Sequence, residues 1–246
     1  FYRILEYNIN TGIEMGEFRP FLPRETGHEY QVDHANGLFF IRTNWEAENF
    51  RVMRARPGVT ADKSSWQEVI PHRDDAMVQS LQAFDDWLVV GERQGGLRKV
   101  RVIARDGSVD RYLDAGEAAS VMWPGNNVNT GTDVIRYGFA SLVTPEQTWE
   151  VDLASGETRL LKAKRVLGGF SSDDYRTERR MVTARDGTQV PVSLAYRKDT
   201  QLDGTALALV YGYGSYGSST DPWFRNSVVS LLDRGFVFAL AHIRGG

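Results

Sequence analysis

Val100-Arg-Val-Ile-Ala-Arg-Asp-Gly107 is an apolar strand followed by a polar turn that contains glycine. The same pattern recurs on both sides of it, in Glu6–Gly12, Arg51–Gly58 and Glu150–Gly156. In chain order the four turn glycines are 46, 49 and 49 residues apart. A second strand of β-rich composition precedes each of the last three turns, and these strands are Leu38–Arg42, Trp87–Gly91 and Val134–Gly138. The chain is therefore organised first of all as a repeat.

A repeat of roughly 40–50 residues, made of short strands and turns, is typical of the four-stranded blades of a β-propeller. A β-sandwich is the alternative, but it predicts a turn roughly every 8–12 residues and gives no reason for the longer period. The first repeat lacks its inner strands, so we expect about three and a half blades. Such an array leaves strand edges unpaired, and we expect further blades upstream of Phe1.

The repeat ends after a last outer strand at Thr158–Leu161. Residues 168–174 then have the Gly, Ser and Asp content of a linker. Two apolar runs follow, Arg180–Ala184 and Val190–Tyr196, with Asp186-Gly187 between them. Asp-Gly between two such runs is a strong signal for a β-hairpin.

Beyond the hairpin, the continuous apolar run Ala206–Val210 predicts a strand buried on both faces of a sheet. A glycine-rich loop follows at residues 211–217. Asp221-Pro222 then reads as the N-cap and first residue of a helix of about three turns, which Gly235 ends. Phe236–Ile243 is another buried strand. Hairpin, strand, loop, helix and strand is the order in which an α/β-hydrolase sheet opens.

These patterns predict two domains with a boundary near residue 165. Residues 1–165 are expected to be the C-terminal blades of a β-propeller. Residues 166–246 are expected to be the N-terminal part of an α/β-hydrolase domain.

Composition excludes several classes of protein. Hydrophobic residues make up 41% of the 246 and charged residues 25%, which is ordinary for a folded domain and unlike a disordered chain. The net charge of −3 and scattered Lys and Arg argue against nucleic acid or an anionic membrane as a partner. The absence of cysteine excludes disulfides and thiolate chemistry. Because a chain without cysteine fits a reducing compartment, we expect a cytoplasmic protein, with the periplasm as the alternative.

The loop Gly212-Tyr-Gly-Ser-Tyr-Gly217 matches the G-x-G-x-x-G dinucleotide fingerprint, but two features argue against a cofactor. The helix begins several residues after the third glycine, and the next strand ends in Ala241-His-Ile-Arg244, with no acid to hold a ribose. In α/β-hydrolases the connection after this strand supplies part of the oxyanion hole. Tyr213 could donate there, or the loop tyrosines could be ordinary packing residues.

No complete catalytic triad is expected within this chain. Ser215 is not part of G-x-S-x-G, and the only histidine after it, His242, lies at a strand end, too early for a triad histidine. The acidic pairs most simply occupy solvated turns, and no metal-ligand spacing occurs. We expect no cofactor and no metal.

Three stretches resemble the prolyl oligopeptidase family, and they are Ala184–Tyr196, the YGYGSYG loop and Ser230–Gly246. The YGYGSYG loop together with Ser230-Leu-Leu-Asp-Arg-Gly-Phe236 resembles the oligopeptidase B branch in particular. In the repeat region, His28-Glu-Tyr30 and Asp86–Gln94 are similar to the same branch. The resemblance covers essentially the whole chain.

This resemblance implies a seven-bladed propeller that caps an α/β-hydrolase domain, in an enzyme that cleaves short peptides after Arg or Lys. It implies that Tyr213 is the oxyanion donor and that Tyr216 lines the substrate cleft. Asp221 matches the first of two acids that contact basic side chains of the substrate in some bacterial members. The second position here is Trp223, so a double-acid subsite is in doubt, and capping of the helix explains Asp221 equally well.

The nucleophile, the triad Asp and His, and the acid of the primary pocket would then lie beyond Gly246. The expected partners are short peptides and the remainder of the same polypeptide. Two alternatives remain at this point. One is a related prolyl oligopeptidase or acylaminoacyl peptidase with a different primary pocket, and the other is a non-catalytic propeller that serves as a binding module.

Overall fold

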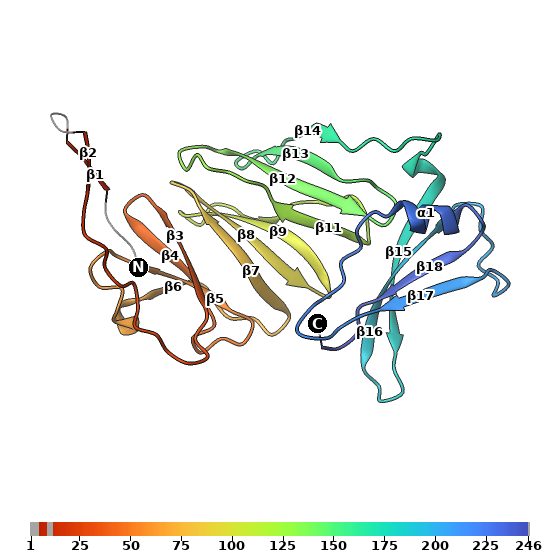
Figure 1. The fold of residues 1–246 in the computed structure, drawn as a ribbon, viewed down its shortest axis with the longest axis horizontal. Helices are drawn as coiled ribbons and strands as arrows, with labels where there is room; N and C mark the ends of the chain where they lie inside the picture. Colours follow the sequence, from red (N-terminus) through yellow and green to blue (C-terminus); the bar gives the residue numbers. More distant parts are fainter. Residues whose placement is uncertain (1–4, 9–11, 246) are drawn as a thin grey trace. The chain divides into compact units, whose positions relative to one another are not determined.

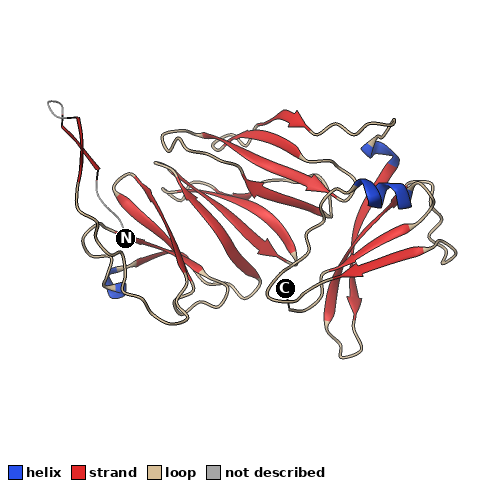
Figure 2. Ribbon diagram, viewed as in Figure 1, coloured by secondary structure: helices blue, strands red, loops and turns tan. Residues whose placement is uncertain are grey.

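The computed structural model describes residues 5–8 and 12–245 (Figure 1). The chain divides into two compact units, Phe1–Asp74 and Asp75–Gly246. Both units consist mainly of antiparallel sheets, and each sheet has four strands except for one pair near the start of the chain. Figure 2 shows how few helical residues accompany these strands.

The first unit contains a two-stranded sheet and a four-stranded sheet. The two-stranded sheet pairs β1 (Leu5–Asn8) with β2 (Gly12–Met15). The four-stranded sheet runs in chain order through β3 (Tyr30–Ala35), β4 (Leu38–Thr43), β5 (Arg51–Ala55) and β6 (Gln67–Ile70). A 3-10 turn, Lys63–Ser65, leads into β6.

Alternating residues of this sheet form the core of the first unit. Ile41 and Met53 are directly opposite each other on β4 and β5, and both are buried. The ring of Phe21 covers them from outside the sheet, in an edge-to-face contact with Phe39 at a centroid distance of 5.2 Å. Trp66 completes the cluster, and its indole N–H donates to the carbonyl of Thr60 at 3.0 Å. The indole N–H of this buried aromatic therefore has a hydrogen-bond acceptor.

The second unit begins with two more antiparallel four-stranded sheets. The first contains β7 (Ala76–Ala83), β8 (Trp87–Gln94), β9 (Leu97–Ala104) and β10 (Asp110–Tyr112). The second contains β11 (Ser120–Pro124), β12 (Val134–Ser141), β13 (Gln147–Asp152) and β14 (Thr158–Ala163). In both sheets every strand pairs with its neighbour in sequence.

The hairpin β8–β9 has eight residues in each strand. Gly95 and Gly96 form its two-residue turn, with φ angles of 56° and 84°. Positive φ at both central residues is the geometry of a type I′ turn, which matches the twist of the flanking strands and favours glycine. On this hairpin Glu92 is 1% exposed, and Arg101 on β9 donates to it at 3.1 Å. A buried carboxylate is therefore paired within its own sheet.

An apolar layer joins the sheet β7–β10 to the sheet β11–β14. Val89 and Val100 from the first sheet share one buried cluster with Met122 and Ile135 from the second. Polar contacts border this layer, because the indole of Trp87 donates to Asp133 at 2.8 Å. Each sheet buries on its neighbour a face that it could not bury alone.

The last sheet is different in topology. Its strands are β15 (Tyr175–Thr183), β16 (Gln189–Arg197), β17 (Ala208–Gly212) and β18 (Val237–Ala241), in the order β15-β16-β18-β17. A 3-10 turn, Ser172–Asp174, precedes β15. β17 runs parallel to β18, and the other pairs are antiparallel. The parallel pair is connected through α1 (Asn226–Leu232), which buries Val228 and Leu232 against β16 and β18.

Most elements lie where the sequence predicts them. The three repeats that begin at residues 38, 87 and 134 each form a four-stranded antiparallel sheet. The hairpin expected around Asp186-Gly187 is β15–β16, and the strand expected at Phe236–Ile243 is β18. The turn of the first repeat falls on residues 9–11, outside the described residues.

Two local predictions are wrong. Asp221 does not cap the helix, because α1 begins at Asn226 behind Arg225 and has no side-chain cap. The helix has seven residues, shorter than the three turns expected, since the Asp221-Pro222 segment is extended loop. The run predicted to be a strand buried on both faces forms β17, and its residues are exposed in the described part of the chain.

We predict that Gly138→Ala destabilises the sheet β11–β14. Gly138 is directly opposite Trp123, and an added Cβ would lie 2.0 Å from the indole ring. Overpacking of this kind costs about 1–3 kcal/mol of unfolding free energy. Urea unfolding of the wild type and the variant measures the cost. In a Trp123→Leu background the same substitution should cost clearly less, and an equal cost in both backgrounds would contradict this explanation.

Candidate functional site

The glycine-rich loop that follows β17 is packed against the end of β18. Because the two strands are parallel and Gly212 is paired with Ala241, both carboxyl ends meet at one edge of the sheet. An added Cβ on Gly214 would lie 2.4 Å from the carbonyl oxygen of Arg244. Farther along the loop, the N–H of Gly217 donates to the carbonyl of Gly245 at 3.1 Å. The loop therefore sits directly on the backbone of the neighbouring segment, which only glycine allows at this distance.

The two tyrosines of this loop are both accessible. Tyr213 is 43% exposed and Tyr216 is 99% exposed. Tyr216 also has a φ of 58°, in the left-handed region that residues other than glycine seldom occupy. Neither side chain is buried within the described residues.

Asp221 lies at the far end of the same loop, and it is buried. Its exposed fraction is 8%. Oδ1 accepts a hydrogen bond from Nη1 of Arg93 at 2.7 Å, and Oδ2 lies 3.8 Å from Nη1 of Arg98. Tyr213 and Asp221 therefore belong to one loop, while the carboxylate of Asp221 already has two cationic partners.

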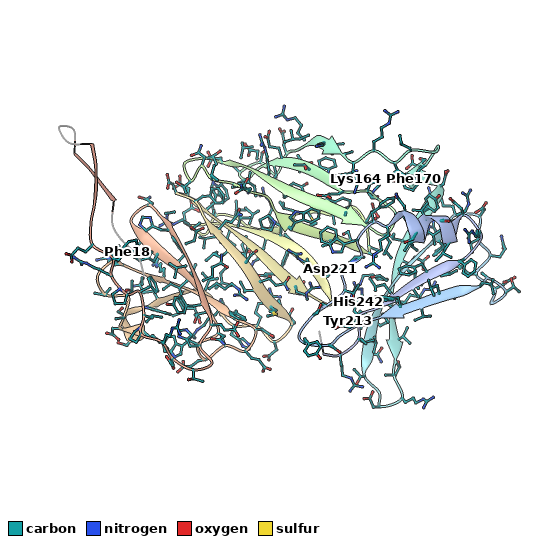
Figure 3. All side chains as sticks on the ribbon, viewed as in Figure 1. Phe18, Lys164, Phe170, Tyr213, Asp221 and His242 are labelled. Atoms are coloured by element: carbon teal, nitrogen blue, oxygen red, sulfur yellow. The ribbon has the colours of Figure 1, made fainter. Side chains whose placement is uncertain are left out.

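The turn of the β8–β9 hairpin lies against the last sheet at the same place. An added Cβ on Gly96 would lie 3.1 Å from the imidazole ring of His242, which immediately follows β18. The carbonyl of the neighbouring Gly95 accepts a hydrogen bond from Arg179 on β15. Figure 3 labels Tyr213, Asp221 and His242 in this region, near the point where the hairpin meets the sheet β15–β18.

His242 is held neutral in this position. Its Nε2 and the hydroxyl of Ser193, which is buried on β16, are 2.8 Å apart. Burial first of all, and then the charges of Arg179 and Arg93, lower the pKa of His242 to about 4, while Asp221 opposes this shift. Nδ1 of His242 and Nη1 of Arg179 are both buried with no partner among the described residues.

The dinucleotide interpretation of the loop does not fit this geometry. A pyrophosphate site needs the third glycine to open directly into a helix N-terminus. Here the chain continues as loop beyond Gly217, and α1 begins only at Asn226. Among the residues that the structure describes, no three His, Asp or Glu side chains gather in a way that could hold a metal ion.

The arginines that meet where the β8–β9 hairpin contacts the last sheet are not identified in the sequence analysis. Arg93 and Arg179 are far from the loop in sequence, and each stands in an ordinary strand pattern. One signal was available, the dipeptide Gly95-Gly96 between two β-rich runs, which predicts a tight hairpin. Nothing in that signal says what the hairpin touches.

Comparison with known proteins identifies the family. Residues 5–164 match the prolyl oligopeptidase N-terminal beta-propeller domain. The chain belongs to the prolyl oligopeptidase family. The sheets β3–β6, β7–β10 and β11–β14 lie within the matched range and are blades of its propeller domain, and β1–β2 lies in the same range.

Several relatives are similar over nearly all of the chain. Dipeptidyl aminopeptidase BI of Pseudoxanthomonas mexicana is 47% identical over 233 residues, which are 94% of this chain and 32% of that protein. Protease 2 of Moraxella lacunata is 31% identical over 91% of this chain and 32% of that protein. The structure of oligopeptidase B from Leishmania major superposes with a TM-score of 0.80 at 30% identity, covering 97% of this chain and 34% of that one. The chain thus spans about a third of the length of these relatives.

No helix in the described part of the chain is both long enough and apolar enough to span a bilayer. The predicted division at residue 165 into propeller and hydrolase parts stays a prediction.

We predict that His242 makes the stability of this protein depend on pH between about 6.5 and about 4. The pKa of His242 is lower in the folded state, so in this window the unfolded chain binds more protons and stability falls as pH falls. Below about pH 4 both states are protonated, and this loss stops. His242→Gln should lower stability at pH 7 but flatten the pH dependence of urea unfolding in that window.

His34→Gln, at an exposed position on β3, is the control and should keep the wild-type pH dependence. An unchanged slope in His242→Gln would show that another group causes the acid loss.

Proposed function

We propose that this chain is part of a serine peptidase that hydrolyses short peptides after Arg or Lys, and that Tyr213 donates a hydrogen bond to the oxyanion. The observation that carries the proposal is the place of Tyr213. It is accessible, and it stands at the carboxyl end of β17 between glycines that rest on the adjoining backbone. Ligands of open α/β sheets bind outside the carboxyl ends of the strands.

The proposed reaction is acyl transfer. A serine oxygen attacks the peptide carbonyl carbon while a histidine takes the serine proton, and the carbonyl oxygen gains negative charge. The leaving amine then takes that proton, and water repeats the sequence to release the acid. Tyr213 and a backbone N–H would stabilise the charged oxygen in both halves. We assign the serine, aspartate and histidine of the triad to the polypeptide beyond this chain.

Of the other two expected site residues, we place Tyr216 in the substrate cleft and leave Asp221 out of it. We propose that Tyr216 lines the substrate cleft, because its side chain is almost wholly accessible beside Tyr213. Asp221 is left out of the proposed cleft, since Arg93 and Arg98 already contact its two oxygens. In the same proposal the propeller restricts the size of substrates, and the expected cytoplasmic location stays a prediction.

A second candidate activity is the release of dipeptides from the N-terminus of a substrate. It is favoured by the relative named dipeptidyl aminopeptidase BI, which shares more sequence identity with this chain than Protease 2 does. Both activities use the same acyl-transfer chemistry. They differ in whether the enzyme requires a free α-amino group two residues before the scissile bond.

We predict that Tyr213→Phe in the intact protein lowers kcat by about 10²–10³, as the loss of one oxyanion donor typically does. KM should change little, because the interaction strengthens only as charge develops in the transition state. Steady-state hydrolysis of a fluorogenic peptide that ends in Arg measures both constants. Tyr211→Phe is the matched control, since Tyr211 lies on β17 and is similarly exposed. A kcat unchanged in Tyr213→Phe would refute the assignment.

The two candidate activities are separated by blocking the substrate's N-terminus. We predict that the intact protein cleaves N-acylated fluorogenic dipeptides that end in Arg, and that Pro in place of Arg abolishes cleavage. Cleavage of the free-amine dipeptide alone would favour the aminopeptidase. A protein that cleaves no peptide and is not labelled by a fluorophosphonate would favour the binding module.

A further inference from the structure

The arginine pair on the β8–β9 hairpin requires a nearby negative charge. Arg93 and Arg98 are directly opposite each other across the antiparallel ladder, so their side chains leave the same face of the hairpin. Like charges in this arrangement repel and destabilise the pair of strands. Arg93 is also mostly buried, with 14% of its side chain exposed, so water screens this repulsion poorly.

Asp221 supplies that charge from the loop between β17 and α1. Its two oxygens divide between the two arginines, at 2.7 Å from Arg93 and 3.8 Å from Arg98. The same Nη1 of Arg93 also donates to the carbonyl of Gly96 at 2.9 Å, which fixes the guanidinium to the turn. The carboxylate is 8% exposed and therefore lies between the hairpin and the loop, away from solvent.

The turn itself fits against the last sheet without space to spare. Gly96 has the imidazole of His242 against it, and Gly95 accepts a hydrogen bond from Arg179. A second contact lies farther along the loop, where the ring centroids of Trp123 on β11 and Trp223 are 4.7 Å apart. The hairpin therefore contacts the last sheet through the hydrogen bond from Arg179 and the packing of His242 on Gly96, and it contacts the loop after β17 through the ion pair with Asp221. The Trp123–Trp223 contact joins the same loop to β11.

The loop that carries Tyr213 is consequently held at both ends. Near Tyr213, Gly214 and Gly217 rest on the segment Arg244–Gly245. At the other end, Asp221 and Trp223 are held by residues of the propeller blades. Between these attachments the loop has no regular secondary structure, so its path depends on them.

From this arrangement we propose that Asp221 is a positioning residue: it ties the loop Gly212–Trp223 to the Arg93–Arg98 pair of the blade and thereby sets the place of Tyr213. The consequence for catalysis rests on the proposed function, whereas the attachment does not. Asp221 acts through the loop and through Tyr213, and it does not contact the substrate. Removal of its charge would leave two facing arginines without this counter-ion and would free the far end of the loop.

The test uses Asp221→Asn and Arg93→Gln in the intact protein, and its first measurement is amide hydrogen exchange. Both variants should exchange faster than the wild type at residues 94–98 and 214–221, since each loses the same ion pair. Asp221→Glu keeps the charge and should restore much of the protection. Asp199→Asn is the control, because Asp199 pairs with Arg197 in the exposed turn that follows β16, and the loss of this pair should leave both segments unchanged.

The second measurement is peptide hydrolysis, with substrates that carry either one or two adjacent basic residues. We expect Asp221→Asn and Arg93→Gln to lower kcat by about 10- to 100-fold, as a small displacement of a catalytic group does, and equally for both substrates. The proposal is overturned if exchange is unchanged in both variants. It is also overturned if Asp221→Asn raises KM for the doubly basic peptide alone while Arg93→Gln has no effect, because Asp221 would then bind substrate.

The proposed function and the positioning role of Asp221 can be refuted independently of each other. If the wild type hydrolyses no peptide, the proposed function is wrong, and the exchange data still decide whether Asp221 holds the loop. Should Arg93→Gln fail to fold, the milder Arg93→Lys gives the same comparison with a smaller effect, and Asp221→Glu stays the variant that keeps the charge.

Discussion

A narrow four-stranded sheet cannot bury its own faces, and this constraint governs residues 75–164. Each sheet is stable only when a neighbour covers its apolar side. In the cluster that joins β7–β10 to β11–β14, Val89 and Val102 are completely buried together with Ile135 and Tyr137 of the neighbouring sheet. A chain that repeats similar sheets meets this requirement simply. Each sheet covers one neighbour with one of its faces and is itself covered on the other.

The same constraint explains why so much of the fold was readable from the sequence. A strand such as Trp87–Gln94 must be apolar on both faces, and its turns must be polar, so the period of the repeat appears directly in composition. The hairpin β15–β16 was predictable for a similar reason, since Asp186-Gly187 is a strong local signal between two β-rich runs. Features decided by neighbours in sequence were predicted well.

Features that depend on residues distant in sequence were predicted less well. Asp221 before Pro222 is a good local cap signal, and it misled because the carboxylate has better partners on a hairpin 128 residues away. The place of β17 at the edge of the sheet, beside β18 and not beside β16, is likewise not evident from its apolar sequence. Of the candidate site, the loop and its tyrosines were predictable from glycine spacing. The arginines and His242 that surround its far end were recognisable only in three dimensions.

The two-residue turn at Gly95-Gly96 has a consequence for how this protein can vary. In an ordinary propeller blade, the turn at the tip of a hairpin faces solvent, and insertions there are well tolerated. This turn instead fills a space bounded by His242 and Arg179, so one extra residue would keep the blade intact and still separate it from the sheet it touches. The length of the turn is therefore set by a partner outside the blade.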